Sequence, residues 1–474
     1  MTLLAFPIGI LLPALAGWLL LSALEGRNRV FWPWERWIWG ALLGMTLMTF
    51  IVFILAAYAR MPVTLMNFLT ALAIMIIPSG AWWMRERKRG GEEPPAPAHH
   101  SSPAKFWRTA LWAWTVWVGL RVVAFLLLLF LMPPFFDDTL DNWNLRGKVF
   151  FLDHALTLQF PWNNDIPGIS SYPPSVPLVK TWMAALAGGW FEPLANGVHL
   201  LWFTAAVAII YGALRRTLTR HWSLFGSVLL MSLPLYLMHG LNAYADVFLS
   251  AHWLAAVIPS YLALTERDAR RSMTWLRIGA LAVALLPFTK NEGWALYFPV
   301  AFFVWMVSAA WMMRRQTISR QQFIRLLALA LALCTLVVFP WIGFKVMHGL
   351  SFGNAKGLDT DFTWHSGVLI AIAVNTFFEG NWVFLFPLLI GLLLFRWKTA
   401  LTTPVLMLTL AVLIPYASQL FAFLFTGLAQ EAIFQTGYAR GVIHLMPVMV
   451  TLAVLLLHDL ISRKNGQLET ETGE

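Results

Sequence analysis

Apolar runs near 20 residues long, separated by short polar segments, follow one another along almost the whole chain. A run of that length crosses the roughly 30 Å hydrocarbon core of a bilayer as an α-helix. The runs are continuous rather than alternating, so membrane-spanning strands are not expected. The pattern predicts spans at residues 3–22, 37–58, 62–84, 106–132, 194–214, 222–238, 246–264, 273–288, 293–313, 323–343, 382–397, 402–427 and 440–460.

Two further apolar runs do not fit a simple alternation of sides. The run 174–189 begins on the same side of the membrane as the span after it. Either the run is re-entrant, or it crosses the membrane and the loop at 188–196 is assigned to the wrong side. The run 366–378 is too short to cross. Half-crossing helices occur at membrane depth where they line a cavity. We therefore expect an all-α, polytopic transmembrane bundle of about 12 to 14 crossings, with short amphipathic helices on the outer side.

Basic side chains gather in clusters between alternate runs. They lie at residues 85–89, 215–220, 267–271, 314–320, 396–398 and 463–464. Lys and Arg collect in cytoplasmic loops of membrane proteins, so topology explains the net charge of +10, and no nucleic-acid partner is expected. The segments predicted on the outer side are then 133–173, 239–246, 289–293, 344–365 and 428–440.

The segment 90–105 is rich in Gly, Pro and Ser and is typical of a flexible cytoplasmic linker. It divides an N-terminal three-helix unit, 1–89, from a body at 106–462, which a cytoplasmic tail at 463–474 follows. The first run is expected to be a retained helix rather than a signal peptide, because it lacks a basic start and a small-residue cleavage site. One cysteine, Cys334, excludes an intrachain disulfide and a CxxC metal site.

Charged residues make up 12% of the chain, against about 25% in soluble domains, so charge on the outer side is notable. The first cluster follows the run 106–132 directly and contains Asp137, Asp138, Asp141, Arg146 and Lys148. A helix over 139–151 would turn Leu140, Trp143, Leu145 and Phe150 towards lipid or core, and such a segment can lie flat at the interface. The alternative is a solvated loop with helix-capping aspartates.

Four more polar groups fall on the outer side. They are Tyr172 before Pro173 and Pro174; His239, Asn242, Tyr244 and Asp246; Lys290 and Glu292; and Arg440 and His444. Each has a structural alternative: a rigid turn at the prolines, a helix N-cap for Asp246, a self-satisfied pair for Lys290 and Glu292, or a lipid-facing arginine. An ionisable group within the membrane nevertheless favours function.

Carboxylates can deprotonate a hydroxyl or hold a divalent cation, and cations can hold a lipid phosphate and stabilise it as a leaving group. Together, around one outward cavity, these groups favour transfer of a group from a lipid-linked phosphate. We therefore predict that Asp138, Asp246, Lys290 and Arg440 converge on a common pocket.

The order of these motifs resembles the GT-C superfamily of polyprenyl-phosphate-sugar-dependent glycosyltransferases, near the protein O-mannosyltransferase and lipid A aminoarabinose transferase families. The residues that carry it are Asp138 with Trp143 and Lys148, Tyr172-Pro173-Pro174, Tyr244-Ala245-Asp246, Thr289 to Gly293, and Arg440 with Pro447. They cover about 106–450. The N-terminal unit has no counterpart in this resemblance, and a large C-terminal domain found in some members is absent.

The resemblance implies that Asp138, with Asp137 beside it, acts as catalytic base or metal-associated acid, and that Asp246 is the second outer acid. It implies donor phosphate on Lys290 and Arg440. Arg146, Lys148, Tyr172, Tyr244, Glu292 and His444 complete the expected substrate site. A Mg²⁺ or Mn²⁺ ion, if one is used, would be held by Asp138 and Asp246.

The resemblance further implies a bacterial inner-membrane enzyme with its site facing the periplasm or cell exterior. The donor would be a polyprenyl-phosphate sugar in the membrane lipid, and the acceptor an envelope glycan, lipid or protein. One alternative is a polymerase or ligase of lipid-linked polysaccharide, although the outer loops are small for one. Another is a transporter or flippase, which the lack of an internal repeat disfavours.

Overall fold

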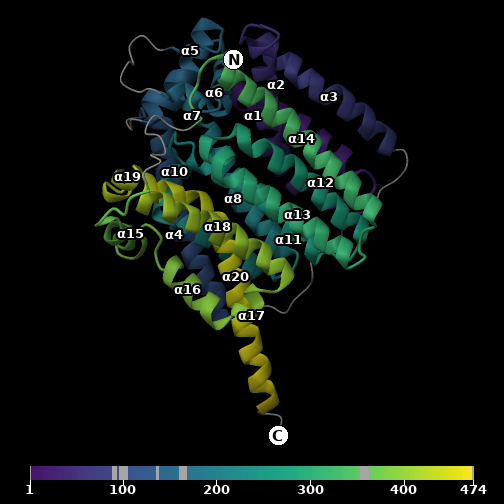
Figure 1. The fold of residues 1–474 in the computed structure, drawn as a ribbon, viewed down its shortest axis with the longest axis vertical. Helices are drawn as coiled ribbons and strands as arrows, with labels where there is room; N and C mark the ends of the chain where they lie inside the picture. The colour runs from purple at the N-terminus through teal and green to yellow at the C-terminus, as the bar shows by residue number, and fades with distance from the viewer. Residues whose placement is uncertain are drawn as a thin grey trace.

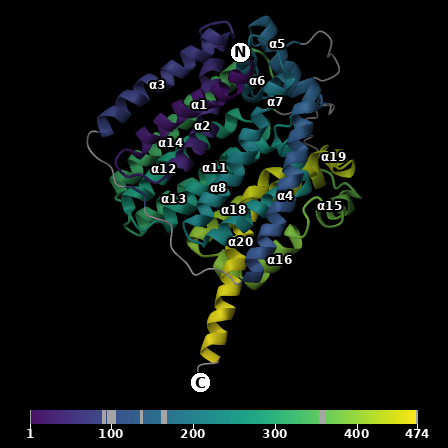
Figure 2. The ribbon, with the colours of Figure 1, turned by 180° about the vertical axis from the view of Figure 1, so that it is seen from behind.

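The computed structural model describes residues 2–87, 93–94, 105–134, 138–159, 168–352 and 362–471. These residues form helices and connecting turns without a β-strand, and the long helices pack side by side in one bundle (Figures 1 and 2). The helices are α1 (Thr2–Glu25), α2 (Pro33–Ala57), α3 (Leu65–Arg87), α4 (Lys105–Leu131), α5 (Leu145–Asp153), α6 (Ser175–Ala187), α7 (Glu192–Asn196), α8 (Val198–Arg215), α9 (Arg220–Ser232), α10 (Pro234–Gly240), α11 (Asp246–Thr265), α12 (Ala269–Leu285), α13 (Phe298–Arg314), α14 (Arg320–Met347), α15 (Val368–Phe377), α16 (Leu385–Phe395), α17 (Trp397–Ala400), α18 (Thr403–Phe425), α19 (Ala429–Ile433) and α20 (Gly437–Glu471).

Ten helices in the described ranges are long and apolar enough to cross a bilayer, or eleven if α9 and α10 are one span bent by 79°. The expected all-α polytopic fold is therefore confirmed, with fewer full-length crossings than the 12 to 14 expected. The run 382–397 explains part of the difference, because its helix α16 has 11 residues, about 16 Å of the roughly 30 Å needed. Helix α12 also falls short, with 17 residues, because the chain changes at its C-terminal end to the 3₁₀ turn η3 (Leu286–Phe288).

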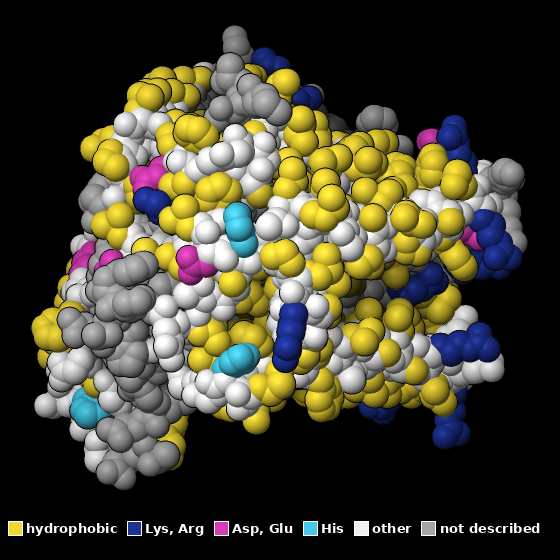
Figure 3. Space-filling model, turned by 90° about the horizontal axis from the view of Figure 1, so that it is seen from above, with side chains coloured by type: hydrophobic (Ala, Val, Ile, Leu, Met, Phe, Trp, Pro, Cys, Tyr) yellow, Lys and Arg dark blue, Asp and Glu magenta, His cyan; other side chains and the backbone are white. Residues whose placement is uncertain are grey.

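Lys and Arg side chains gather at one end of the molecule in the space-filling view (Figure 3). The two Arg-rich turns after α8 and α13, and the one before α12, are among the segments that the sequence assigned to a single side. This end is called the basic end below. A basic end of this kind fits a multi-pass membrane protein whose loops obey the positive-inside rule.

Helix α11 is the centre of the bundle. Every residue from Asp246 to Ala263 is buried, and α8, α12, α13, α18 and α20 pack around it. In a bilayer such packing rests on close van der Waals fit and on hydrogen bonds rather than on removal of apolar surface from water. The N-terminus of this buried helix places the Asp246 carboxylate inside the protein.

The N-terminal helices α1 and α2 pack on α6 and α8 of the body. Gly17 lets α1 and α2 touch backbone to backbone, since a Cβ there would lie 2.0 Å from the carbonyl oxygen of Gly40. Arg216, after α8, donates to both carboxylate oxygens of Glu35 at 2.6 and 2.8 Å. Small residues and a bidentate ion pair thus hold the first two helices against the rest.

Helix α6, from the ambiguous run 174–189, has 13 residues and ends at Gly188, whose φ of 72° stops the helix. About 20 Å of helix cannot cross the hydrocarbon core. Its residues Ser175 to Ala184 are buried, so α6 is a short helix enclosed by protein, as the re-entrant alternative requires.

Candidate functional site

The segment that carries the first predicted acids begins as a π-helical turn, η1 (Asp138–Asn144), and continues as α5. Single π-helical turns are often found at functional sites. Trp143 and Phe150 are buried while Leu140 is exposed, so one face packs on the body as an interfacial amphipathic helix would. Asp138 stands at the start of this segment, with its side chain 36% exposed.

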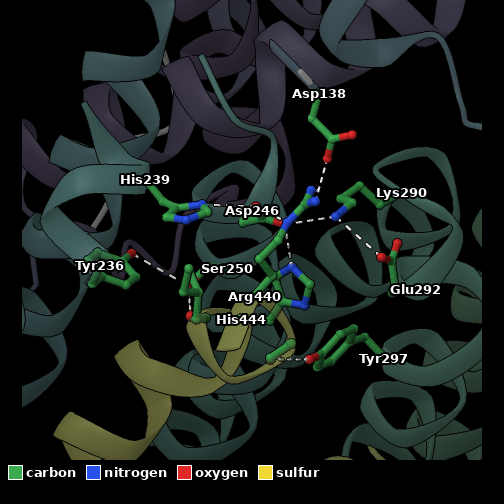
Figure 4. A network of polar contacts seen from close by, with 12 residues as sticks. Asp138, Tyr236, His239, Asp246, Ser250, Lys290, Glu292, Tyr297, Arg440 and His444 are labelled. Atoms are coloured by element: carbon green, nitrogen blue, oxygen red, sulfur yellow. Dashed lines mark hydrogen bonds and ion pairs between the residues drawn. The ribbon is translucent and has the colours of Figure 1, made fainter. Parts of the chain in front are cut away.

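Asp246 forms the centre of a polar network (Figure 4). Its side chain is fully buried. Oxygen Oδ1 accepts from Lys290 Nζ at 2.8 Å and lies 3.2 Å from His444 Nε2. Oxygen Oδ2 accepts from Arg440 Nε at 3.1 Å and lies 3.1 Å from His239 Nδ1. A buried carboxylate is tolerated when it is paired and hydrogen-bonded in this way.

Arg440 and Lys290 connect this buried acid to two acids nearer the surface. The Arg440 guanidinium forms an ion pair with Asp138 as well as with Asp246. Lys290 Nζ lies 3.3 Å from Glu292 Oε1, and the Glu292 side chain is 38% exposed. Asp138, Asp246, Lys290 and Arg440 thus belong to one connected network, although they are far apart along the chain.

Aromatic rings border the network. Tyr244 stacks on His239 with ring centroids 4.3 Å apart, and the Arg440 guanidinium lies 5.3 Å from the Tyr244 ring centre. Tyr297, the last residue of the π-helical turn η4 (Gly293–Tyr297), contacts His444 edge to face with ring centroids 5.5 Å apart. These contacts fix the orientation of the cation and of both imidazole rings.

The donor set leaves little room for a divalent cation at Asp246. All four directions around its carboxylate are taken by nitrogen groups, two of them cationic. Across the described ranges, no group of three or more His, Cys, Asp and Glu side chains could hold a metal ion. The expected Mg²⁺ or Mn²⁺ remains a prediction.

Two of the expected substrate residues, Lys148 and Arg146, do not contact the network acids in the described ranges, while Tyr172 lies close enough to Arg440 to interact with it electrostatically. Lys148 is exposed on α5, and within the part of the chain that the structure describes it forms no ion pair. Tyr172 is half-buried with its ring 5.6 Å from Trp143. Arg146 is buried, and it donates to the Tyr172 carbonyl oxygen at 3.0 Å rather than to a carboxylate. Asp137 lies outside the described residues.

Three polar residues outside the expected catalytic and substrate set lie at the site: His239, named among the outer polar groups, Asn291, within the motif Thr289 to Gly293, and Lys345. His239 contacts Asp246, and its position seven residues before that acid at a helix end is the sequence feature that points to it. Asn291 accepts from Lys345 Nζ at 3.3 Å and donates to Ser171. Lys345 lies near the end of the long apolar helix α14, and an ionisable group inside a span was the available indication.

No protein-family model and no curated protein matches the chain. Among solved structures it is similar to the crystal structure of ArnT from Cupriavidus metallidurans in the apo state, with 17% identity and a TM-score of 0.50. The similarity covers 76% of this chain and 62% of the ArnT chain, which is less than two thirds of that protein. Identity this low establishes a shared fold and leaves the chemistry open. The chain is therefore a multi-pass membrane protein with a fold similar to that of ArnT, as the sequence resemblance implied for its fold.

Proposed function

We propose that the protein is a membrane glycosyltransferase, which moves a sugar from a polyprenyl-monophosphate donor to a hydroxyl group of an envelope glycan, lipid or protein. The observation that carries the proposal is the arrangement of Asp138, Arg440 and Asp246. A partly exposed carboxylate and a buried carboxylate share one guanidinium. The shared fold with ArnT supports the same class of reaction.

In the proposed reaction, Asp138 accepts the proton of the acceptor hydroxyl, because it is the network acid that begins the outer segment and is open to solvent. The hydroxyl oxygen attacks the anomeric carbon of the sugar, and the bond between that carbon and the phosphate oxygen breaks. The electron pair leaves with the polyprenyl phosphate, and the configuration inverts. Asp138 ends protonated and returns its proton to water.

Asp246 has a different role in this mechanism. Because it is fully buried and already accepts from four nitrogen groups, it cannot reach a substrate hydroxyl. It holds Lys290 and Arg440 in place, and in this mechanism Arg440, which also contacts Asp138, stabilises the charge that develops on the leaving phosphate. Fixed cations of this kind stabilise a transition state without reorganisation. Asp246 is therefore a positioning residue.

The site lies at the end of the bundle opposite the basic end. The positive-inside rule puts basic loops in the cytoplasm, so the proposed site faces the periplasm or cell exterior of an inner-membrane protein. A donor whose sugar is already attached to a lipid in that leaflet needs no nucleotide on this side.

The test is the Asp138→Asn variant, expressed in cells that lack the wild-type gene. Mass analysis of surface glycans, lipids and proteins should show a modification restored by wild type and reduced about 100-fold or more by the variant, the typical contribution of a general base. The matched control is Asp153→Asn, which removes an exposed carboxylate at the end of α5. Full modification by Asp138→Asn at normal protein levels would exclude Asp138 as the base.

A further inference from the structure

The network around Asp246 has no spare positive charge. Among the described residues it joins three carboxylates, Asp138, Asp246 and Glu292, to two cations, Lys290 and Arg440. A phosphate that entered this network alone would add to an excess of negative charge. A phosphate-bearing donor therefore needs further cations close by.

Two such cations lie beside the network. Arg146 and Lys345 are each 1% exposed, and across the described ranges neither forms an ion pair. Arg146 donates to Asn142 Oδ1 at 3.4 Å and to the Tyr172 carbonyl, while its Nε has no partner. Burial lowers the pKa of the Arg146 guanidinium, because loss of water disfavours its charged form.

Lys345 is held by neutral groups only. Its Nζ donates to the Ser351 carbonyl at 2.9 Å and to Asn291 Oδ1 at 3.3 Å, and it lies 5.1 Å from the Trp341 ring centre. Removal of a cation from water costs several kcal/mol unless an opposite charge compensates. Two buried cations without a countercharge in the described ranges form a positive site that an anion would neutralise.

A series of hydrogen bonds and sequence neighbours connects Lys345 to Arg146 and to Lys290. Asn291, which accepts from Lys345, is the neighbour of Lys290 and donates to Ser171 Oγ at 3.4 Å. Ser171 precedes Tyr172, whose carbonyl accepts from Arg146. Arg146 is eight residues after Asp138, about 12 Å along a helical axis. An acceptor hydroxyl, a sugar carbon and a phosphate in line can bridge such a distance.

A narrow cleft gives access to Arg146. Besides Arg146 it is lined by Ser170 and by the apolar side chains Phe150, Leu156, Leu158, Pro174, Trp341 and Phe344. Its volume of about 10 Å³ holds about one water, so a single anion oxygen fits inside while the rest of the headgroup lies outside. Apolar walls around one cation suit the phosphate of a lipid better than a free, fully hydrated anion.

We infer that Arg146 and Lys345 bind the phosphate group of the polyprenyl lipid, with its isoprenoid chain along the apolar wall formed by Leu156, Leu158 and Phe344. The inference rests on the proposed function and names the phosphate site within it. Arg440 and Lys290 then act on the leaving oxygen, and Arg146 and Lys345 neutralise the charge that the phosphate carries before the reaction. Lys180, a third buried cation, is not part of this site, because the opposite charge of Glu192 acts on its ammonium group, whereas the charge that acts on Lys345 is that of Arg146.

The test measures binding of undecaprenyl phosphate to the purified full-length protein in phosphatidylcholine nanodiscs. The uncharged polyprenol, inorganic phosphate and phosphatidylglycerol serve as comparison probes. The variants are Arg146→Gln, Lys345→Gln and the charge-preserving Arg146→Lys. The matched control is Arg325→Gln, which removes an exposed cation from the other end of α14. Thermal unfolding of each variant identifies any loss of fold.

Wild type should bind undecaprenyl phosphate at least 10-fold more tightly than polyprenol or inorganic phosphate. Arg146→Gln and Lys345→Gln should each weaken binding roughly 10-fold or more, Arg146→Lys should weaken it less, and Arg325→Gln should leave it unchanged. Wild-type affinity in folded Arg146→Gln and Lys345→Gln, with loss in Lys290→Gln or Arg440→Gln, would overturn the inference and leave the proposed function intact. Equal binding of phosphatidylglycerol would overturn the assignment to a polyprenyl lipid. Wild type that binds no polyprenyl phosphate would remove the proposed function as well.

Discussion

The substitution Asp246→Asn removes one buried charge and keeps the shape of the side chain. Its carboxylate accepts from Lys290 at 2.8 Å and from Arg440 at 3.1 Å. A hydrogen bond to a charged group contributes about 1.5–3 kcal/mol, and loss of one partner of a buried pair costs about 3–5 kcal/mol. Lys290 keeps Glu292 and Arg440 keeps Asp138, so we expect the free energy of unfolding to fall by about 3 kcal/mol, the lower end of that range.

The assay is equilibrium unfolding of the purified protein in mixed micelles for wild type, Asp246→Asn, Lys290→Gln and the double variant. If the two groups interact directly, the double variant should be more stable than the sum of the single losses allows, by about 1–3 kcal/mol. The exposed Asp153→Asn should change stability by no more than about 0.5 kcal/mol. Asp246→Asn with wild-type stability, or a coupling energy near zero, would refute the assignment of Asp246 as the buried partner of both cations.

Three further predictions concern the bundle. Gly17→Ala should destabilise the protein by about 1–3 kcal/mol, because the added methyl group would clash with the Gly40 carbonyl oxygen. The control is Gly119→Ala, whose added methyl group would have no neighbouring atom within 4 Å. Equal unfolding midpoints for the two variants would contradict the close approach of α1 and α2. Arg216→Lys keeps the positive charge but loses the two parallel hydrogen bonds to the Glu35 carboxylate. Amide hydrogen exchange should therefore become faster in α2 and stay unchanged in α18. Unchanged exchange in α2 would contradict the role of Arg216 in anchoring that helix. In a Cys334→Ala background, a membrane-impermeant thiol reagent added to the outer face should label Asp153→Cys and spare Arg267→Cys; the reverse pattern would invert the proposed orientation.

The long helices could be predicted from the sequence because each apolar run carries its own evidence. Helices α1, α11 and α18 begin and end within a few residues of their predicted spans. The run 222–238 predicts one span, but Pro234 cannot continue the helix, and the chain bends by 79° between α9 and α10. The run 440–460 is part of α20, which continues as a helix to Glu471 through the predicted tail, a polar extension that hydropathy does not detect.

The site was less accessible to sequence reasoning, because burial depends on which helices meet. The motif order brought Asp138, Asp246, Lys290 and Arg440 into consideration, yet spacing alone could not separate an exposed acid from a fully enclosed one. An N-cap role for Asp246 was the simpler local interpretation, and the structure shows a hub for four nitrogen groups instead. The sequence marks Lys345 as an ionisable residue near the end of an apolar run, but only the structure shows that its neighbours are neutral.

The π-helical turn η1 has a consequence for how the protein tolerates length changes. A π-helical turn contains about one residue more than an α-helical turn, so removal of Leu140, which is exposed, would let the segment that begins at Asp138 enter α5 as one α-helix. Each residue of an α-helix corresponds to about 100° of rotation. In the shortened chain α5 would stay packed on the body, while the Asp138 side chain would turn away from Arg440. This single deletion would therefore leave membrane insertion and folding intact and abolish the proposed reaction.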